Sequence, residues 1–435
     1  MTADPFDAET PWPRAALDRA CLRDHQDASL RTLASALETN QFYAAKLHEA
    51  GMTPSDLRTC DDLARVPFTT KQELVADQTA HPPFGRLPTY PRTRYRYLHQ
   101  TSGTSGRPLL WLDTDEDWAT WMRCWYAVYR GAGVGPGDFV FGAFSFGPYI
   151  SHWAAMAGAR HAGALALAGG GASSEQRLRA IVDRGCTVLV STPTYALHLA
   201  EVARREGIDL GRSAVRVTIH AGEPGASVPA VSARIERAWG ARCFDHAGAT
   251  EVGAWAFACQ ARRDALHLNE LDFAFDVIDP ESLAPVPDGA RGELVITTLG
   301  RHGMPVLRYR TGDLVERVSE LCACGLTLSC IRGGVLGRVD DMLIVRGVNV
   351  YPAAIDDLVR AIPEIVEYEV EIRRLEQMDD LLLKLEIEAG AVFADVERAV
   401  AAGARSALNI RVDVVEALRG SLPRYELKAR RYKRV

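Results

Sequence analysis

The sequence lacks the features that mark several large classes of protein. Its most apolar stretch, 150–172, is interrupted by His152, Arg160 and His161, so it does not suit a membrane span. Residues 1–14 have neither a basic start nor an apolar segment, and we expect no secretory signal. Neither sign of charge dominates, with 50 Lys and Arg against 56 Asp and Glu. We therefore expect no membrane partner and no nucleic-acid partner.

Cysteine is also scarce. Nine cysteines in 435 residues, an odd number, do not fit a disulfide scaffold. Together with the expected absence of a secretory signal, this predicts a cytoplasmic protein whose reduced thiols are free to bind a metal. The apolar fraction of 47% and the charged fraction of 24% are those of a globular protein. The length predicts two or three domains.

The hydrophobic pattern changes along the chain. Residues 13–80 have apolar residues at helical spacing, and 92–97 alternate with the period of a strand. Between 118 and 242, helical stretches alternate with short apolar runs, which predicts a parallel sheet that binds ligands at the carboxyl ends of its strands. The expected strands are 139–141, 164–167, 187–190 and 215–219, and the expected helices are 118–132, 174–184, 194–206 and 228–239.

Two further changes define the expected fold class, which is α/β. From 273 onward, turns and alternating segments predict an antiparallel β subdomain. After Asp340 the pattern starts afresh and fits a compact α+β domain of roughly 95 residues. We expect a large N-terminal domain, residues 1–339, with the βα-alternating sheet, and a small mobile C-terminal domain, residues 340–435, with a hinge at Asp340.

A polar segment, 101–106, follows the strand expected at 92–97. It has four hydroxyl residues and two glycines in six positions. Glycine lets the backbone approach a phosphate, and hydroxyls and amides donate hydrogen bonds to it, so the segment suits an anion-binding loop. A polar loop without a ligand is the alternative. The segment fits a P-loop NTPase poorly, because Gly-Lys-Ser/Thr is missing.

Three further motifs place carboxylates beside glycines. In 245–251, Glu251 suits Mg²⁺ and Thr250 suits a phosphate contact, although a capped turn would have the same composition. In 308–313, Asp313 at a turn can accept hydrogen bonds from both hydroxyls of a ribose. In 337–341, charged pairs beside a glycine suit a hinge and equally an exposed turn.

In this order and spacing, the four motifs resemble those of the adenylate-forming superfamily of acyl- and aryl-CoA synthetases, adenylation domains and luciferases. The chain is most similar to the phenylacetate-CoA ligase branch, through its shortness, the segment 66–71 (VPFTTK) and the segment 337–352 (GRVDDMLIVRGVNVYP). The resemblance runs from about Phe42 to the C-terminus.

The resemblance implies roles for individual residues in binding ATP and AMP. They are Thr101, Ser102, Gly103, Thr104, Ser105 and Gly106 on the β- and γ-phosphates, Gly222, Glu223 and Pro224 beside adenine, Asp245, His246 and Gly248 nearby, and Asp313 and Arg338 on the ribose.

It also implies the catalytic groups. Thr250 and Glu251 would bind phosphate and Mg²⁺, and Lys428 would contact the substrate carboxylate and the α-phosphate. Asp340 would be the hinge, and Gly347 would lie on the CoA side after the small domain rotates.

The sequence departs from the family pattern at three places. The phosphate loop continues as Arg107-Pro108-Leu109, where many relatives have lysine after the proline. The aromatic residue usual before Gly248 is Ala247, which weakens any expectation of ring stacking there. The glycine usual before the C-terminal lysine is Leu427, which leaves Lys433 as a less favoured rival to Lys428.

A separate group of residues suits a metal. Cys259, His267, Cys322 and Cys324 offer three thiols and an imidazole in two clusters, and Cys330 is a spare ligand. Reduced thiolates with an imidazole suit tetrahedral Zn²⁺, and four protein ligands would make the site structural. Some members of the branch are similar here. The alternative is that these cysteines are small buried apolar residues.

The segment after the strand 139–141 is where the family places its acid-binding residues. Its aromatic rings and glycine suit a flat substrate, and ordinary core packing is the alternative. The residues expected to line this substrate pocket are Phe144, Phe146, Tyr149, His152, Ala221 and Ala247.

The resemblance implies an ATP-dependent aryl-CoA ligase that uses ATP, Mg²⁺ and coenzyme A, and the cysteine and histidine residues predict a structural Zn²⁺ in addition. The acid would be aromatic: a substituted benzoate, such as an amino- or hydroxybenzoate, or phenylacetate. His152 and Ser145 favour a substituted benzoate, because they offer polar partners for a ring substituent. Two alternatives stay open: delivery of the acyl group to a carrier-protein thiol, an amine or a hydroxyl, and a nucleotide-binding sensor without catalysis. The oligomeric state, a homodimer included, is open as well.

Overall fold

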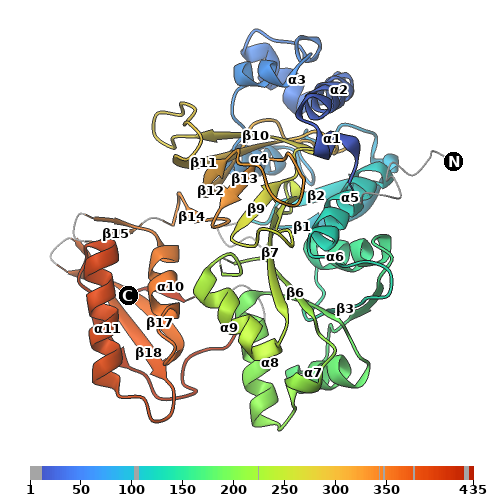
Figure 1. The fold of residues 1–435 in the computed structure, drawn as a ribbon. Coiled ribbons are helices and arrows are strands. Elements are labelled where there is room, and N and C mark those ends of the chain that lie inside the picture. The colour runs from blue at the N-terminus through green and yellow to red at the C-terminus, as the bar shows by residue number, and fades with distance from the viewer. Residues whose placement is uncertain are drawn as a thin grey trace.

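The structure is a computed structural model that describes residues 12–101, 107–223, 225–341, 343–345, 348–375, 378–425 and 431–435. Figure 1 shows a large N-terminal body and a smaller C-terminal one, drawn in orange and red. This arrangement confirms the expected α/β class with a small α+β domain. None of the helices in the described ranges is both long enough and apolar enough to cross a membrane.

The N-terminal region is helical, as predicted. Its main helices are α1 (Arg14–Leu17), α2 (Arg19–Leu37), α3 (Gln41–Glu49) and α4 (Lys71–Ala80). Three of them begin at a side chain that accepts a hydrogen bond from a free backbone N–H of the first turn: Asp18 for α2, Asn40 for α3 and Thr70 for α4. Short 3₁₀ turns, Pro54–Asp56 and Cys60–Arg65, connect α3 to α4.

The predicted parallel strands are confirmed. The strands β3 (Phe139–Gly142), β4 (Leu165–Ala168), β5 (Val188–Ser191), β6 (Val217–His220) and β7 (Arg242–Ala249) pair in parallel in the order β7-β6-β5-β3-β4. The helices around them are α5 (Asp115–Gly131), α6 (Ile150–His161), α7 (Ser174–Asp183), α8 (Pro193–Arg205) and α9 (Pro229–Trp239).

Alternate residues of these strands enter different cores. Val140, Val217 and Phe244 pack with α5 and α6, whereas Phe141, Leu189 and Cys243 pack with α7, α8 and α9. This is the period-two alternation of strands with both faces covered.

The antiparallel region continues the same sheet. Its strands are β8 (Gly253–Phe257), β9 (Ala265–Leu268), β10 (Phe273–Ile278), β11 (Arg291–Thr298), β12 (Tyr309–Val318), β13 (Cys330–Arg332) and β14 (Gly337–Arg338). Strand β7 joins the two parts, because it pairs in parallel with β6 through residues 242–245 and antiparallel with β8 through 246–249. The sequence pattern showed both parts but not the strand that they share.

The strand predicted at 92–97 begins later. Residues Arg92–Arg94 form a 3₁₀ turn closed by a hydrogen bond from Arg94 N to Pro91 O, and β1 covers Tyr95–Gln100. The prediction was wrong at this end, because the proline starts a turn that the alternating pattern did not show. β1 pairs antiparallel with β2 (Leu110–Thr114) in a two-stranded sheet.

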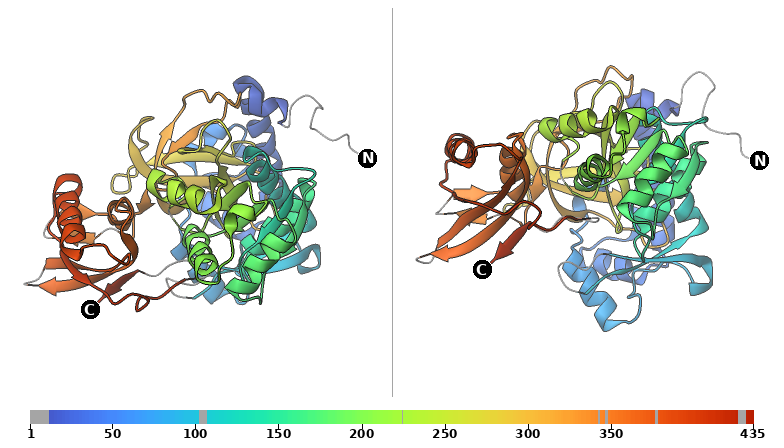
Figure 2. Two further views of the ribbon diagram at one scale, coloured as in Figure 1. Left: turned by 60° about the horizontal axis from the view of Figure 1, so that its bottom comes forward. Right: turned by 90° about the horizontal axis from the view of Figure 1, so that it is seen from below.

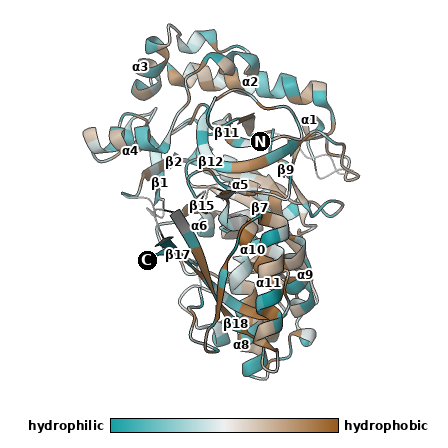
Figure 3. Ribbon diagram, turned by 90° about the vertical axis from the view of Figure 1, so that its left-hand side faces the viewer, coloured by the Kyte–Doolittle hydropathy of each residue, from teal (hydrophilic) through white to brown (hydrophobic). Residues whose placement is uncertain are grey.

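The small domain has a core of its own. It contains β15 (Leu343–Val345), β16 (Val348–Val350), β17 (Ile365–Leu375), β18 (Met378–Ile387), β19 (Asp413–Glu416) and β20 (Tyr432–Arg434), with α10 (Pro352–Arg360) and α11 (Phe393–Leu408). Figure 3 shows apolar stretches along β17 and β18 beside these helices, and the buried side chains there form a cluster separate from the large domain. Figure 2 shows the small domain to one side of the large one in both views.

Candidate active site and metal centre

The turn after β7 places Glu251 in a buried position with a cation beside it. The Glu251 carboxylate is 7% exposed, and its Oε1 lies 3.3 Å from Nζ of Lys71. The hydroxyl of Tyr309 lies 3.4 Å from the same oxygen. A buried carboxylate needs a charged or hydrogen-bonding partner, and Lys71 supplies the positive charge. Glu251 is the predicted Mg²⁺ ligand, but Lys71 was not among the predicted site residues.

Lys71 reaches this turn because its segment is bound to the start of β12. Thr69 N donates to Arg308 O at 3.0 Å, and Arg310 N donates to Thr69 O at 2.9 Å. The Arg308 guanidinium stacks on the Phe68 ring at 4.0 Å from its centroid. α4 then begins at Lys71 itself. The signal in the sequence was the VPFTTK segment, which carried the family resemblance but gave no indication of where its lysine points.

Arg301 fixes the backbone of the same turn. Its Nη1 donates to Thr250 O at 3.1 Å and to Val252 O at 3.0 Å, so it holds the residues on both sides of Glu251. Its Nε and Nη2 bind one oxygen of Asp113 at 3.0 and 2.6 Å, and both side chains are almost fully buried. Burial raises the pKa of Asp113 to about 6, although the Arg301 charge opposes this rise. Sequence reasoning missed both residues.

The predicted ribose partners lie together. Strands β12 and β14 pair Asp313 with Arg338, and the Arg338 guanidinium lies 3.1 Å from the Asp313 carboxylate. The same guanidinium binds Asp340, the predicted hinge residue, at 2.8 Å. Gly312 has φ +75°, and a Cβ there would come within 2.8 Å of Arg338, so glycine suits this approach.

The predicted adenine segment lies at the end of β6, beside β7. Gly222 has φ +93°, and Glu223 accepts a hydrogen bond from Thr194 N, in the first turn of α8, at 2.8 Å. The carboxyl ends of the adjacent strands β6 and β7 thus lie at one edge of the sheet, as predicted. Thr101 is buried, and its hydroxyl accepts a hydrogen bond from Leu109 N.

Strand β7 turns its predicted site residues to both faces. Asp245 is buried and accepts hydrogen bonds from Ser227 N and Oγ at 3.0 and 2.5 Å, and burial raises its pKa to about 7. His246 is buried against Trp125 of α5, and burial lowers its pKa to about 3, so its imidazole is neutral. Gly248 lies at a bulge, where a Cβ would meet Gly253 O at 2.9 Å.

The predicted substrate-pocket aromatics gather at the end of β3 and the start of α6. Phe144 stacks on His152 with ring centroids 4.4 Å apart, and Phe146 packs edge-on against Trp153 at 4.6 Å. Tyr149 lies 6.3 Å from His152. Burial lowers the pKa of His152 to about 4, so this ring is neutral too. These contacts make a single aromatic cluster and are compatible with a pocket wall and with core packing.

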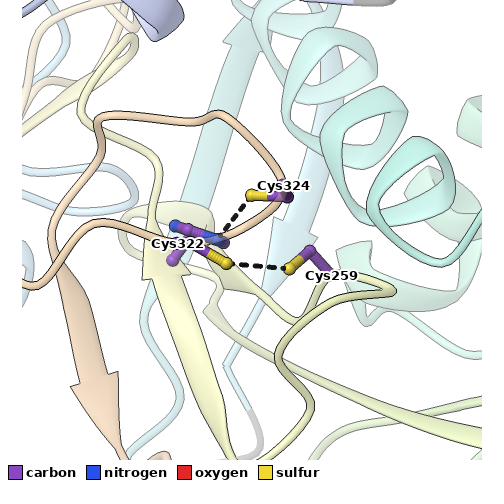
Figure 4. A group of neighbouring side chains, drawn as sticks. Cys259, Cys322 and Cys324 are labelled. Carbon is purple, nitrogen blue, oxygen red and sulfur yellow. Dashed lines mark hydrogen bonds between the residues drawn. The ribbon is translucent and has the colours of Figure 1, made fainter.

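The predicted metal ligands converge. One ligand atom from each of Cys259, His267, Cys322 and Cys324 lies within 4.8 Å of all the others. Figure 4 shows Cys322 and Cys324 on one loop, with the Cys322 and Cys259 side chains pointing toward each other. The Sγ atoms of Cys259 and Cys322 are 3.6 Å apart, and Cys324 Sγ lies 3.4 Å from His267 Nε2. Ligands of a tetrahedral Zn²⁺ with bonds of about 2.0–2.3 Å are about 3.3–3.8 Å apart, so the residues fit the ion.

Cys330, the spare ligand of the sequence analysis, lies behind the histidine. Its Sγ is 3.3 Å from His267 Nδ1, the ring nitrogen opposite the one that faces Cys324. The antiparallel pairing of β9 with β13 sets His267 directly across from Cys330. Cys330 is therefore placed to orient the imidazole and not to join the four converging donors.

Several predicted residues lie outside the described part of the chain: Ser102, Gly103, Thr104, Ser105, Gly106, Pro224, Gly347 and Lys428. Lys433, the rival to Lys428, lies on β20, and its ammonium pairs with Glu369 of the same domain.

Comparison with known proteins agrees with this geometry. The family model described as AMP-binding enzyme matches residues 21–302, and AMP-binding enzyme C-terminal domain matches residues 347–433. The chain is 34% identical to phenylacetate-coenzyme A ligase of Thermus thermophilus over 85% of this chain and 82% of that one. It is 31% identical to phenylacetate-coenzyme A ligase of Escherichia coli over 92% and 91%.

A solved enzyme matches the whole structure. 2-Hydroxyisobutyryl-CoA ligase in its postadenylation state, in complex with 2-HIB-AMP, superimposes with a TM-score of 0.93 at 32% identity, over 99% of this chain and 94% of that one. The same enzyme in its thioesterification state gives only 0.75. The small domain therefore lies as in the first state. The chain belongs to the AMP-binding enzyme family, in its branch of AMP-forming acid–CoA ligases similar to phenylacetate-coenzyme A ligase.

Proposed function

We propose that this protein is an ATP-dependent aryl-CoA ligase, which activates an aromatic carboxylic acid as an acyl-AMP and transfers the acyl group to coenzyme A. The observation that carries the proposal is the pair of partly exposed Lys71 with buried Glu251, in the turn after β7, the strand beside the one that leads to Gly222 and Glu223. In this proposal the pair supplies the cation and the metal-binding carboxylate that would hold the polyphosphate of ATP.

The chemistry of the first step follows from the charges. A carboxylate is a poor electrophile, so its oxygen attacks the α-phosphorus of ATP in line and displaces pyrophosphate. Attack brings two anions together, and fixed positive charge nearby lowers that barrier. Lys71 supplies such a charge. Glu251 would hold Mg²⁺, which when bound neutralises phosphate charge.

The second step needs another arrangement of the small domain. In this proposal Lys428 contacts the acid and the α-phosphate while acyl-AMP forms. The small domain, residues 340–435, then rotates about Asp340, which removes Lys428 and brings Gly347 to the CoA side. Asp340 is bound to Arg338 at 2.8 Å, so the hinge is tied to a ribose-side residue in the present arrangement.

The proposed substrate is an aromatic acid, a substituted benzoate or phenylacetate. The aromatic cluster of Phe144, Phe146 and His152 offers flat apolar faces, and the neutral His152 offers a hydrogen-bonding nitrogen to a ring substituent. Four relatives carry the name phenylacetate-coenzyme A ligase, which supports an aryl acid.

An acid panel tests the proposal. Phenylacetate, benzoate, amino- and hydroxybenzoates and 2-hydroxyisobutyrate would each be supplied with ATP, with and without CoA. We expect pyrophosphate release with an aromatic acid and thioester only when CoA is present. Faster turnover of 2-hydroxyisobutyrate than of every aromatic acid would contradict the aryl proposal. Acyl-AMP that CoA cannot discharge would favour a carrier-protein thiol as acceptor.

We also propose that the Cys259, His267, Cys322 and Cys324 cluster binds a structural Zn²⁺. Four protein ligands leave no open position for chemistry, so the ion would tie the loop that carries Cys322 and Cys324 to β9.

A further inference from the structure

Two arginines of the small domain contact one helix of the large domain. Arg431 donates from Nη2 to Thr194 Oγ1 at 3.2 Å, and Arg424 Nε lies 3.5 Å from Glu201 Oε2. Thr194 and Glu201 are seven residues apart on α8, so they lie on one face of that helix. Arg424 and Arg431 are also seven residues apart, and they flank the segment 425–430, which includes Lys428.

Each arginine also has a carboxylate partner in its own domain. Arg431 binds Glu367 at 2.8 Å, and both side chains are about 5% exposed. Arg424 binds Glu386 at 2.7 Å, and the Glu386 side chain is fully buried. Of the contacts that these two arginines make, rotation of the small domain would break those with α8 and keep those with Glu367 and Glu386, so neither guanidinium would be left buried without a counter-charge. The contacts of Arg424 and Arg431 with α8 can therefore stabilise one arrangement of the two domains and be lost when the small domain rotates.

The contact at Thr194 also reaches the predicted nucleotide site. Thr194 N donates to Glu223, the residue expected beside adenine, and the Glu223 charge acts on Arg431. Thr194 thus links Arg431 of the small domain to Glu223, in the segment that would bind adenine.

We propose that Arg424 and Arg431 are positioning residues, which dock the small domain on Glu201 and Thr194 of α8 and so hold Lys428 at the site while acyl-AMP forms. This proposal rests on the proposed function, since it assigns the docked arrangement to the first half-reaction. The structure agrees with the postadenylation state of 2-hydroxyisobutyryl-CoA ligase, which holds 2-HIB-AMP, and not with its thioesterification state, which supports placing the docked arrangement before thioester formation.

The test changes only the large-domain side, so the pairs within the small domain stay intact. Glu201→Gln and Thr194→Val, alone and together, would be assayed in each half-reaction: pyrophosphate release from acid and ATP, and thioester formation from preformed acyl-AMP and CoA. Adenylation should fall about fivefold in each single variant, as expected for the loss of one polar contact, buried at Thr194 and partly exposed at Glu201, and further in the double variant. Thioester formation should stay unchanged or rise. Glu206→Gln, at the end of α8, is the matched control and should change neither.

Small-angle X-ray scattering of the ligand-free proteins separates this proposal from the proposed function. Wild-type scattering should fit the docked arrangement, and the double variant should deviate from it. If no acid supports pyrophosphate release but the scattering still shifts, the proposed function fails and the docking role stands. Equal loss of both half-reactions with an intact fold, or no change in rates and scattering, would overturn the docking role.

Discussion

Two arginine-centred contacts of this protein differ in what surrounds them. Arg301 lies within the large domain, as do its hydrogen-bond partners Asp113, Thr250 and Val252. Arg431 divides its hydrogen bonds between Glu367 of its own domain and Thr194 of the other. The first arrangement cannot be broken without stranding a buried charge, whereas the second can. The turn that carries Glu251 is thus held by a buried ion pair within one domain, whereas the contact between the domains can be lost without stranding a buried charge.

The largest effect is expected when Glu251, in the turn held by Arg301, loses its charge. Glu251→Gln keeps the shape of the side chain but removes the carboxylate, so Mg²⁺ and Lys71 lose their common partner. Adenylation should fall by about 10²–10³-fold, the range seen when electrostatic stabilisation of a transition state is removed. Pyrophosphate release measures it. Glu316→Gln, a partly buried carboxylate of β12 that pairs with Arg332, is the control. A near-normal rate in Glu251→Gln would show that another residue holds the metal.

The next effect separates the half-reactions. Lys428→Ala should slow synthesis from acid and ATP by about 10²-fold, because its ammonium would bridge the carboxylate and the α-phosphate in that step alone. The same variant, supplied with preformed acyl-AMP, should still form thioester with CoA. Lys433→Ala serves as the comparison, since Lys433 already pairs with Glu369. If Lys433→Ala alone produced the separation, the two-step model would hold and the choice of lysine would be wrong.

Breaking the ion pair between Asp113 and Arg301 should lower both the stability and the activity of the protein. Asp113→Asn leaves the Arg301 guanidinium buried without its counter-charge, and loss of one partner of a buried ion pair costs about 3–5 kcal/mol. The free energy of unfolding, from denaturant titration, measures this. Adenylation should fall as well, since Arg301 holds the carbonyls on both sides of Glu251. A variant as stable as the wild type would show that this pair does not anchor the turn.

The smallest effect on catalysis is expected at the metal centre. Purified protein should contain about one zinc per chain, and Cys322→Ser should lose it and unfold at a lower temperature while retaining adenylation in the folded fraction. Cys330→Ser should keep the metal but bind it about 10–100-fold more weakly, because that thiol orients His267 from behind. Metal analysis and chelator titration check both. Protein purified without chelator that carries no zinc would contradict the site.

The parallel sheet and the family could be predicted because both depend on patterns among residues that are close together in the sequence. Apolar runs such as 187–190 and 215–219 alternate with helical stretches, and the carboxylate motifs follow strand ends at family spacing. Sequence reasoning missed Arg301 and Lys71, because their partners lie 188 and 180 positions away and only the tertiary fold brings them together. Helix α6 was missed for another reason. The apolar and polar residues of 150–161 do not separate onto two sides of a helix, so the sequence showed an apolar segment there but no amphipathic helix.

Strand β7 offers one practical consequence for engineering. Asp245 binds the loop before α9, and the next residue, His246, packs against α5 on the opposite face. Substitutions at 245 would therefore change the surroundings of the loop before α9, and substitutions at 246 would change the packing against α5, although the two positions are adjacent. An insertion or deletion of one residue between 242 and 245 would exchange the two environments, because side chains along a strand alternate between its faces. Substitution, and not a change of length, is thus the way to vary one of the two environments without disturbing the other.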